Sequence, residues 1–243
     1  MLKKISLSVV IPAYNEEKLI KDTLEKVYEY LSKNKHNWEI IVSNDGSTDQ
    51  TSKIVNSFKR RKVRLVGNIK NQGKGNALKK GIINSAGDYV IFMDADLSVS
   101  LNNIDIFLKE FDKGHEVVIA SRRIKGSKIL VHQSPIRENM GRVFTLLTNI
   151  ITGVNISDFT CGFKGFSKKA AKKIFANSQI DRWAYDAEIM FLAHKLGYNI
   201  KEVPVFWANR VETRVRLKSV VFETFRDLIK IRINDLLGKY DSG

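Results

Sequence analysis

Residues 89–98, YVIFMDADLS, constrain the fold of this chain more than any other stretch. An apolar run of this length, bounded by turn residues, is typical of a strand covered on both faces of a sheet. Two carboxylates, Asp94 and Asp96, follow the run directly. Because ligands bind beyond the carboxyl ends of the strands in open parallel sheets, the stretch predicts a site at this strand end.

Carboxylates spaced one residue apart repel each other, so each raises the pKa of its neighbour unless a cation compensates. The simplest compensation is a divalent cation that Asp94 and Asp96 hold together with substrate phosphates. The alternative is structural, since Asp96 or Ser98 could cap the helix predicted over residues 101–113.

Apolar runs and helical periodicity alternate along the chain, which predicts a mostly parallel sheet with right-handed crossovers. Strands are predicted at residues 7–11, 38–43, 63–66, 89–93, 116–120 and 199–205, and residues 158–167 are predicted to form a loop and a strand. Helices are predicted at residues 17–31, 49–58, 71–85, 101–113, 138–151, 168–175, 178–196 and 217–237.

The first three strands each end in a loop rich in Asp, Asn, Gly or Pro, and these loops share the carboxyl edge of the predicted sheet. Glu16 and Asp45 could accept hydrogen bonds from a base or ribose, and Tyr14 could stack on the base. Lys74, between two glycines at a helix start, could meet phosphate oxygens. The alternative is that these residues only form turns.

Further along the chain, Arg122 and Arg123 follow a predicted strand, where a guanidinium suits phosphate oxygens. Asp186 and Glu188 are two residues apart on a predicted helix, so they point to different faces. We assign Asp186 to the site; a first-turn acid stabilised by the helix dipole is the alternative.

Composition narrows the choice of partner and compartment. The chain has 41 Lys and Arg against 26 Asp and Glu, a net charge of +15 that favours anionic partners. Aromatic residues are not interleaved with the basic runs, which argues against a nucleic-acid-binding module. The single Cys161 excludes an internal disulfide framework and favours a cytosolic setting. No apolar stretch approaches the ~20 residues that cross a bilayer.

Four motifs in this order closely resemble the family 2 glycosyltransferases of the GT-A fold: VVIPAYNEE at residues 9–17, NDGSTD at 44–49, NQGKG at 71–75 and DADLS at 94–98. The segments DFTCGFK at 158–164 and RWAYDAE at 182–188 look most like the dolichyl-phosphate glucosyltransferase branch. The DADLS motif followed by arginines is also similar to dolichyl-phosphate mannose synthases. Phe159 departs from the polar residue expected in its loop.

The resemblance implies inverting transfer of a hexose from a nucleotide-diphosphate sugar, such as UDP-glucose or GDP-mannose, to a polyprenyl phosphate. Asp94 and Asp96 would hold Mg²⁺ or Mn²⁺ and the diphosphate, with Ala95 between them. Arg122 and Arg137 would bind the acceptor phosphate. The residues implied for the nucleotide are Pro12, Tyr14, Asn15, Glu16, Asp45 and, more weakly, Lys74.

Other enzyme classes share parts of this pattern. QIDRW at residues 179–183 matches the Gln-x-x-Arg-Trp pattern of processive polysaccharide synthases, which carry transmembrane helices. Sugar-phosphate nucleotidyltransferases have a similar sheet, but their glycine- and arginine-rich first loop is replaced here by PAYN. An alcohol acceptor would need a general base, for which Asp186 is the candidate.

We expect a glycosyltransferase domain over residues 1–213 and a basic amphipathic helical tail over 214–243. Leu217, Val221, Phe225, Leu228 and Ile229 form the apolar stripe of that helix. The stripe could lie in an anionic membrane interface on the cytoplasmic face, with help from the helix at residues 140–151, or it could dock on the core or on a second subunit.

Overall fold

The computed structural model describes residues 6–33, 36–58, 60–209 and 217–241, with only the backbone described for 217–222. Within these residues a seven-stranded sheet has the order β3-β2-β1-β4-β7-β5-β8. Its strands are β1 (Ser6–Ala13), β2 (Asn37–Asp45), β3 (Val63–Asn68), β4 (Tyr89–Met93), β5 (Val117–Ser121), β7 (Phe163–Ser167) and β8 (Ile200–Pro204). The strand ahead of Asp94 and Asp96 is therefore central, as predicted.

The sheet is mostly parallel, as the alternating pattern predicts. β1 pairs in parallel with β2 and β4, and β5 pairs in parallel with β8. The exception is β7, which lies antiparallel between β4 and β5. That insertion brings the segment before β7 to the same edge of the sheet as the end of β4.

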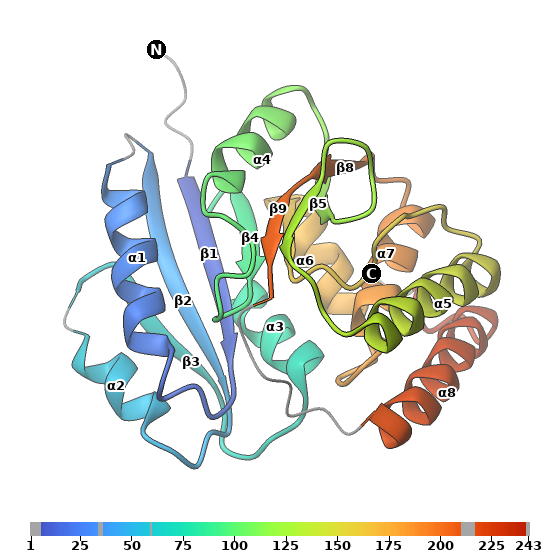
Figure 1. Cartoon of the computed structure of the whole chain (residues 1–243), viewed down its shortest axis with the longest axis horizontal. Helices are drawn as coiled ribbons and strands as arrows, with labels where there is room; N and C mark the ends of the chain where they lie inside the picture. Colours follow the sequence, from blue (N-terminus) through green and yellow to red (C-terminus); the bar gives the residue numbers. More distant parts are fainter. Residues whose placement is uncertain (1–5, 34–35, 59, 210–216, 242–243) are drawn as a thin grey trace.

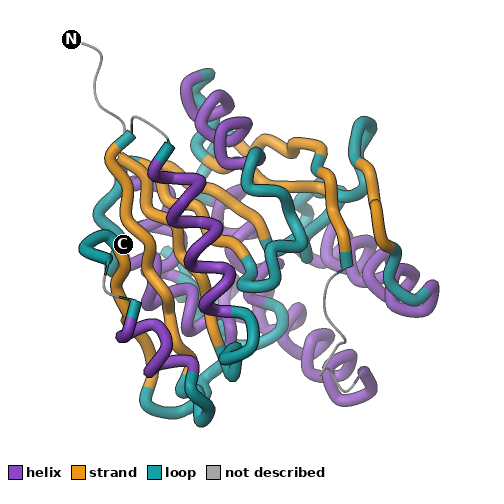
Figure 2. The backbone as a smooth tube through the Cα atoms, turned by 60° about the vertical axis from the view of Figure 1, so that its left-hand side comes forward, coloured by secondary structure: helices purple, strands orange, loops and turns teal. Residues whose placement is uncertain are grey.

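Helices cover both faces of the sheet (Figures 1 and 2). Alternate residues of β1 face opposite layers: Val9 and Ile11 pack with one core cluster, and Val10 packs with the other. The first cluster contains α1 (Ile20–Ser32), α2 (Thr51–Ser57) and α4 (Asn103–Asp112). The second contains α3 (Lys74–Ile83), α6 (Lys168–Asn177), α7 (Tyr185–Lys195) and α8 (Leu217–Leu236).

The helix expected to start at residue 178 begins instead at Tyr185. The segment before it is not helical, and the backbone N–H groups of Gln179 and Ile180 donate to the carboxylate of Glu188. Asp186 and Glu188 thus lie in the first turn of α7.

A second small sheet, which the sequence analysis did not predict, lies over the end of β4. It pairs β6 (Lys128–Val131) with β9 (Phe206–Ala208). Val99 forms an isolated bridge with Trp207, and the N–H of Ala208 donates to the carbonyl of Ser98. The segment after Asp96 is thereby tied to β9.

The C-terminal helix exists as predicted, and its inner side docks on the domain. Helix α8 lies beside α5 (Pro135–Thr152), as Figure 1 shows. Leu228 and Ile231 are buried in the second cluster, whereas Phe225 and Ile229 are exposed, so the predicted stripe is divided. The side chains of Leu217 and Val221 and the junction at residues 210–216 lie outside the described residues. No helix in the described part of the chain is both long and apolar enough to cross a membrane.

Candidate functional site

Asp94 and Asp96 lie on a tight turn at the carboxyl end of β4. The next residue, Leu97, is buried with φ of 53°, a conformation that costs energy for a non-glycine residue and often marks a site. Asp96 Oδ1 accepts a hydrogen bond from the N–H of Ser98 at 2.9 Å. The N-cap of α4 is Asn102, so the alternative role of Asp96 or Ser98 as the cap of this helix is wrong.

Both carboxylates line a hollow that is open to solvent. Gly162 and Phe163, at the start of β7, form one wall, and Trp207 of β9 forms another. The antiparallel insertion of β7 and the small sheet therefore complete a site of which β4 supplies the acids.

Lys74 lies directly opposite Asp94. Its Nζ is 2.5 Å from Asp94 Oδ1, and it is the first residue of α3. Burial works against the charge, but Asp94 and the nearby Asp186 raise the pKa of Lys74 well above its ordinary value. The ammonium and the N-terminus of α3 together offer positive charge to a phosphate beside the carboxylate pair.

Asp45 fixes the loop that carries Lys74. Its two carboxylate oxygens accept hydrogen bonds from the side chains of Asn68 and Asn71 and from the N–H groups of Gln72 and Gly73, at 2.8–2.9 Å. Gly73 has φ of 115°, which favours glycine at this turn. Asp45 thus has a positioning role that the sequence analysis did not predict; its contact with a nucleotide stays a prediction.

The loop after β1 is cross-linked to the loop after β2. Asn15, at φ of 56°, donates its N–H to Ser47 Oγ and accepts at Oδ1 from the N–H of Thr48. The N–H of Glu16 donates to Thr51 Oγ1. Tyr14 projects with 44% of its surface exposed, and Pro12 is buried in β1. Tyr14 is accessible for the stacking contact that we predicted.

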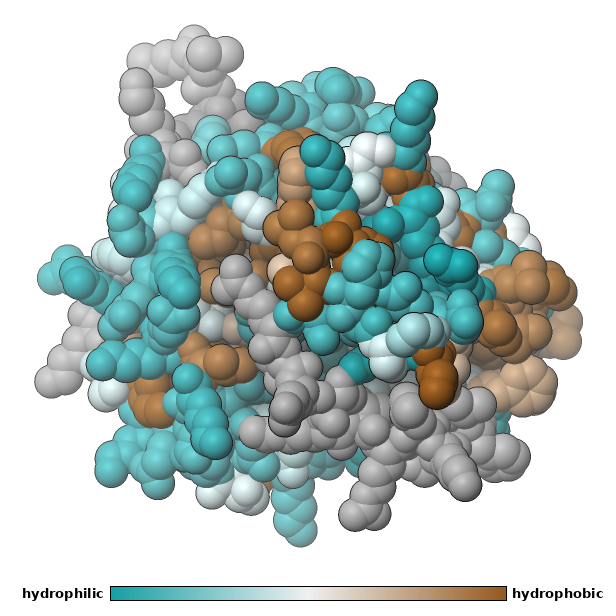
Figure 3. Space-filling model, viewed as in Figure 1, coloured by the Kyte–Doolittle hydropathy of each residue, from teal (hydrophilic) through white to brown (hydrophobic). Residues whose placement is uncertain are grey.

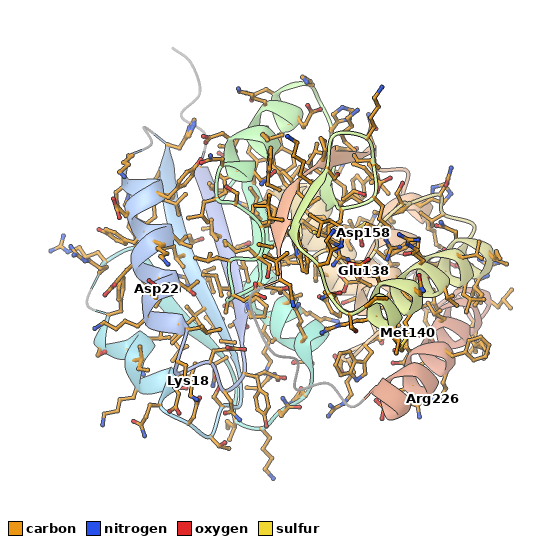
Figure 4. The ribbon with its side chains drawn as sticks, in the orientation of Figure 1. Lys18, Asp22, Glu138, Met140, Asp158 and Arg226 are labelled. Atoms are coloured by element: carbon orange, nitrogen blue, oxygen red, sulfur yellow. The ribbon has the colours of Figure 1, made fainter. Side chains whose placement is uncertain are left out.

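Arg122 follows β5, as predicted, and is engaged by a buried carboxylate. Its Nε and one terminal nitrogen bind the two oxygens of Asp158 at 2.7 and 2.8 Å, and the same terminal nitrogen donates to Thr160 Oγ1. Burial opposes both charges, but the pairing outweighs it: the pKa of Arg122 is raised and the pKa of Asp158 is lowered. The side chain of Asp158 is fully buried, and Figure 4 labels it near the centre of the view.

Arg137 lies in the first turn of α5, close enough to Arg122 that their charges interact. Burial, followed by the charge of Arg122, lowers the pKa of Arg137. The neighbouring Arg123 donates to Thr145 Oγ1 at 2.6 Å, an internal contact. Two like charges held near each other favour an anion between them, so Arg122 and Arg137 fit a phosphate.

Asp186 points into the interior, where Lys164 is its partner. The Nζ of Lys164 lies 2.5 Å from Asp186 Oδ1, donates to the carbonyl of Cys161 and is fully buried. Glu188 points elsewhere and accepts from Tyr240 at 2.6 Å, so the prediction that the two acids face different sides is confirmed. Both acids also lie in the first turn of α7, which fits the alternative that Asp186 is a first-turn acid stabilised by the helix dipole.

The acidic pair suits a hard divalent cation. Among the residues that the structure describes, no group of three or more His, Cys, Asp or Glu side chains converges. Two half-buried carboxylates supply oxygen ligands, as Mg²⁺ and Mn²⁺ prefer, and diphosphate oxygens and water would complete the coordination. The donor set therefore fits the predicted metal.

The chain is similar to known proteins over most of its length. Residues 8–175 match the family model described as "Glycosyl transferase family 2". The dolichyl-phosphate beta-glucosyltransferase of Dictyostelium discoideum is 32% identical over 251 aligned residues, which cover 98% of this chain and 77% of that protein. The proteins of that name from Homo sapiens and Saccharomyces cerevisiae are 29% and 31% identical; the alignments cover 96% and 98% of this chain and 77% of each relative.

Solved structures show the same fold. Mannosyl-3-phosphoglycerate synthase from Rubrobacter xylanophilus superposes with a TM-score of 0.68 at 15% identity, covering 98% of this chain and 76% of that one. Glucosyl-3-phosphoglycerate synthase from Mycobacterium tuberculosis, with Mn²⁺, UDP-glucose and glycerol 3-phosphate, superposes with a TM-score of 0.64 at 20% identity, covering 98% and 81%. The GT-A fold expected from the sequence is thus confirmed.

Proposed function

The chain belongs to glycosyl transferase family 2, and from this premise we propose that it transfers glucose from a nucleotide-diphosphate sugar to a polyprenyl phosphate of the dolichyl type. One observation carries the proposal: the Asp94 and Asp96 pair has Lys74 beside it and two arginines further along the same sheet edge. The dolichyl-phosphate beta-glucosyltransferases aligned over nearly the whole chain support glucose as the hexose and dolichyl phosphate as the acceptor.

On the donor side, we propose that Asp94 and Asp96 bind a divalent metal together with the diphosphate, while Lys74 binds a diphosphate oxygen. Bound there, Mg²⁺ or Mn²⁺ would stabilise the charge of the departing diphosphate. Tyr14 would stack on the base, and Glu16 and Asn15 would face the nucleoside from the loop that Ser47 and Thr48 hold.

On the acceptor side, the nucleophile needs no general base. A phosphate monoester has a second pKa of about 6, so its oxygens are largely deprotonated at neutral pH. Arg137 and Arg122 would orient this anion toward the anomeric carbon and reduce its repulsion by the carboxylates. The pairing of Asp186 with the buried Lys164 supports this division, because the carboxylate is already engaged by an internal ammonium.

The acceptor lipid also suggests where the protein lies. Figure 3 shows apolar surface gathered at the right-hand edge, over α5 and α8. Its exposed apolar side chains are Val143, Leu146 and Ile150 on α5 and Phe225, Ile229 and Ile233 on α8. Arg226 and Lys230 are exposed on the same helix, and each basic residue near an anionic surface contributes about 1 kcal/mol. We propose that this face contacts the cytoplasmic surface of a membrane.

One screen tests the function. The purified protein is incubated with UDP-glucose, GDP-mannose or other nucleotide sugars, with Mg²⁺ or Mn²⁺, and with a short-chain polyprenyl phosphate. We expect a metal-dependent product whose mass equals that of the acceptor plus one hexose, formed fastest from UDP-glucose. A product only from GDP-mannose would replace glucose by mannose. Transfer to a glycan or alcohol, with none to the phosphate, would overturn the proposed acceptor.

A further inference from the structure

Gly162 stands where the backbone of β7 passes closest to the acidic pair. The N–H of Asp94 donates to the carbonyl of Gly162 at 3.1 Å, which joins the ends of β4 and β7. A Cβ built on Gly162 would lie well inside van der Waals contact of Cγ and Oδ2 of Asp94, and 2.8 Å from Oδ1. The carboxylate of Asp94 therefore occupies the space that any other residue at position 162 would fill with its side chain.

Two contacts hold Asp94 in this position. Lys74 holds Oδ1 on the side of α3, and the backbone bond to Gly162 holds the main chain. A displaced carboxylate would lose at least one of these contacts. Lys74 thus restrains the carboxylate of Asp94, and Gly162 restrains its main chain.

The loop that carries Gly162 is equally constrained. On one side, Asp158 forms its two-pronged pair with Arg122. On the other, the buried ammonium of Lys164 binds the carbonyl of Cys161 and the carboxylate of Asp186. Buried ion pairs at both ends of the loop therefore oppose its retreat from an added methyl group.

We propose that Gly162 is a positioning residue for the metal-binding carboxylate: the absence of a side chain at this position sets where Asp94 stands and hence how the donor diphosphate and its cation are held. The inference deepens the proposed function and rests on the metal role of Asp94 stated there. In this view the ion pairs of Lys164 and Asp158 have the same role, because both restrain the backbone around Gly162 and so the position of Asp94.

The first test is Gly162→Ala. Its matched control is Gly165→Ala, three residues further along, in β7. A Cβ on Gly165 would meet the side chains of Phe107 and Phe111 in the core, at 2.7 and 2.9 Å, and so overpacks the protein far from Asp94. We expect Gly162→Ala to weaken Mn²⁺ binding in the presence of a nucleoside diphosphate at least tenfold, measured by titration calorimetry. Gly165→Ala should lower the unfolding temperature and leave Mn²⁺ affinity within twofold.

A double-mutant cycle tests whether Gly162 acts through Asp94. Gly162→Ala should lower the unfolding temperature by several degrees in the wild-type background and by much less in the Asp94→Ala background, where the clash is absent. Equal losses in both backgrounds, or unchanged Mn²⁺ affinity of Gly162→Ala, would overturn the inference. Failure of the wild-type protein to bind Mn²⁺ would overturn the metal role of Asp94 and the link of Gly162 to the metal. The double-mutant cycle would still measure the coupling between Gly162 and Asp94.

Discussion

The ammonium of Lys74 and the carboxylate of Asp94 are 2.5 Å apart, although the two residues come from different loops at the carboxyl edge of the sheet. In the proposed function, this pair joins the residue that binds a diphosphate oxygen to one that binds the metal. A diphosphate with its cation carries both charges. The negative diphosphate can take the place of Asp94 beside Lys74, and the cation can take the place of Lys74 beside Asp94. If the donor binds as proposed, the charges that meet it are already arranged in the protein.

Lys74→Ala should raise the KM for the nucleotide sugar about 10- to 100-fold, as expected for the loss of one charged hydrogen bond. Binding of Mn²⁺ without nucleotide should not weaken, because Asp94 loses only a competing cation. Steady-state kinetics measure the KM, and a metal titration measures the Mn²⁺ affinity. Lys80→Ala, in the last turn of the same helix, is the control and should leave the KM unchanged.

Asp96→Ala should reduce turnover roughly 100-fold or more, because a bound cation contributes several kcal/mol to stabilising the leaving group. The fold should persist, since the carboxylate makes a short local contact to Ser98. Initial rates at rising Mg²⁺ or Mn²⁺ provide the measurement. Asp22→Ala is the matched removal of a surface carboxylate: Asp22 lies on α1, labelled at the left of Figure 4, and pairs there with Lys26. Near-normal, metal-independent turnover by Asp96→Ala would refute the assigned metal ligand.

Arg137→Ala and Arg122→Ala should differ in stability although both impair use of the acceptor. Arg137→Ala is expected to raise the KM for polyprenyl phosphate at least tenfold with little change in unfolding temperature. Arg122→Ala also leaves the buried Asp158 without its partner, which costs about 3–5 kcal/mol of unfolding free energy. Urea denaturation and acceptor titrations separate the effects. An unchanged acceptor KM in both variants would place the phosphate elsewhere.

Asp158→Asn should reveal the same pair through its pH dependence. The folded protein lowers the pKa of Asp158 below the unfolded value of about 4, so the unfolded state binds more protons as the pH falls. The stability from ionised Asp158 is fully present above pH 4 and is lost as the pH falls through the folded pKa. The difference in unfolding free energy between wild type and Asp158→Asn should thus shrink below pH 4. A constant difference from pH 7 to pH 3 would contradict the assignment.

Phe225→Ser combined with Ile229→Ser should weaken binding to anionic vesicles at least fivefold while the unfolding temperature stays nearly unchanged, because both side chains are exposed. Leu228→Ala, on the buried side of the same helix, is the matched control and should cost about 2–5 kcal/mol of stability without changing vesicle affinity. Co-sedimentation at two salt concentrations measures the binding. Loss of stability in the double variant, with vesicle binding retained, would make the outer side of α8 structural.

Local patterns in the sequence determined most of the fold and the core of the site. The apolar run before Asp94 and Asp96, and the strand, loop and helix alternation around it, predicted a central strand that ends in acids. The loops at Asn15, Asp45 and Lys74 also lie at the predicted edge. These predictions depend on side-chain periodicity and turn chemistry within short segments, so neighbouring residues suffice to make them.

Tertiary structure decided which charges meet. Arg122 pairs with Asp158, which is 36 residues further along the chain, and Lys164 pairs with Asp186, which is 22 residues further along. Sequence patterns could identify these side chains as charged but not as partners, because the antiparallel insertion of β7 determines both encounters. The same holds for Gly162, where only the approach of two strand ends shows that the missing side chain makes room for Asp94. The apolar pattern of α8 likewise did not show which side of the helix is buried. An amphipathic helix has the same periodicity whether its stripe contacts protein or lipid. In the structure, α8 packs on α5 and α7, and Leu228 and Ile231 are buried.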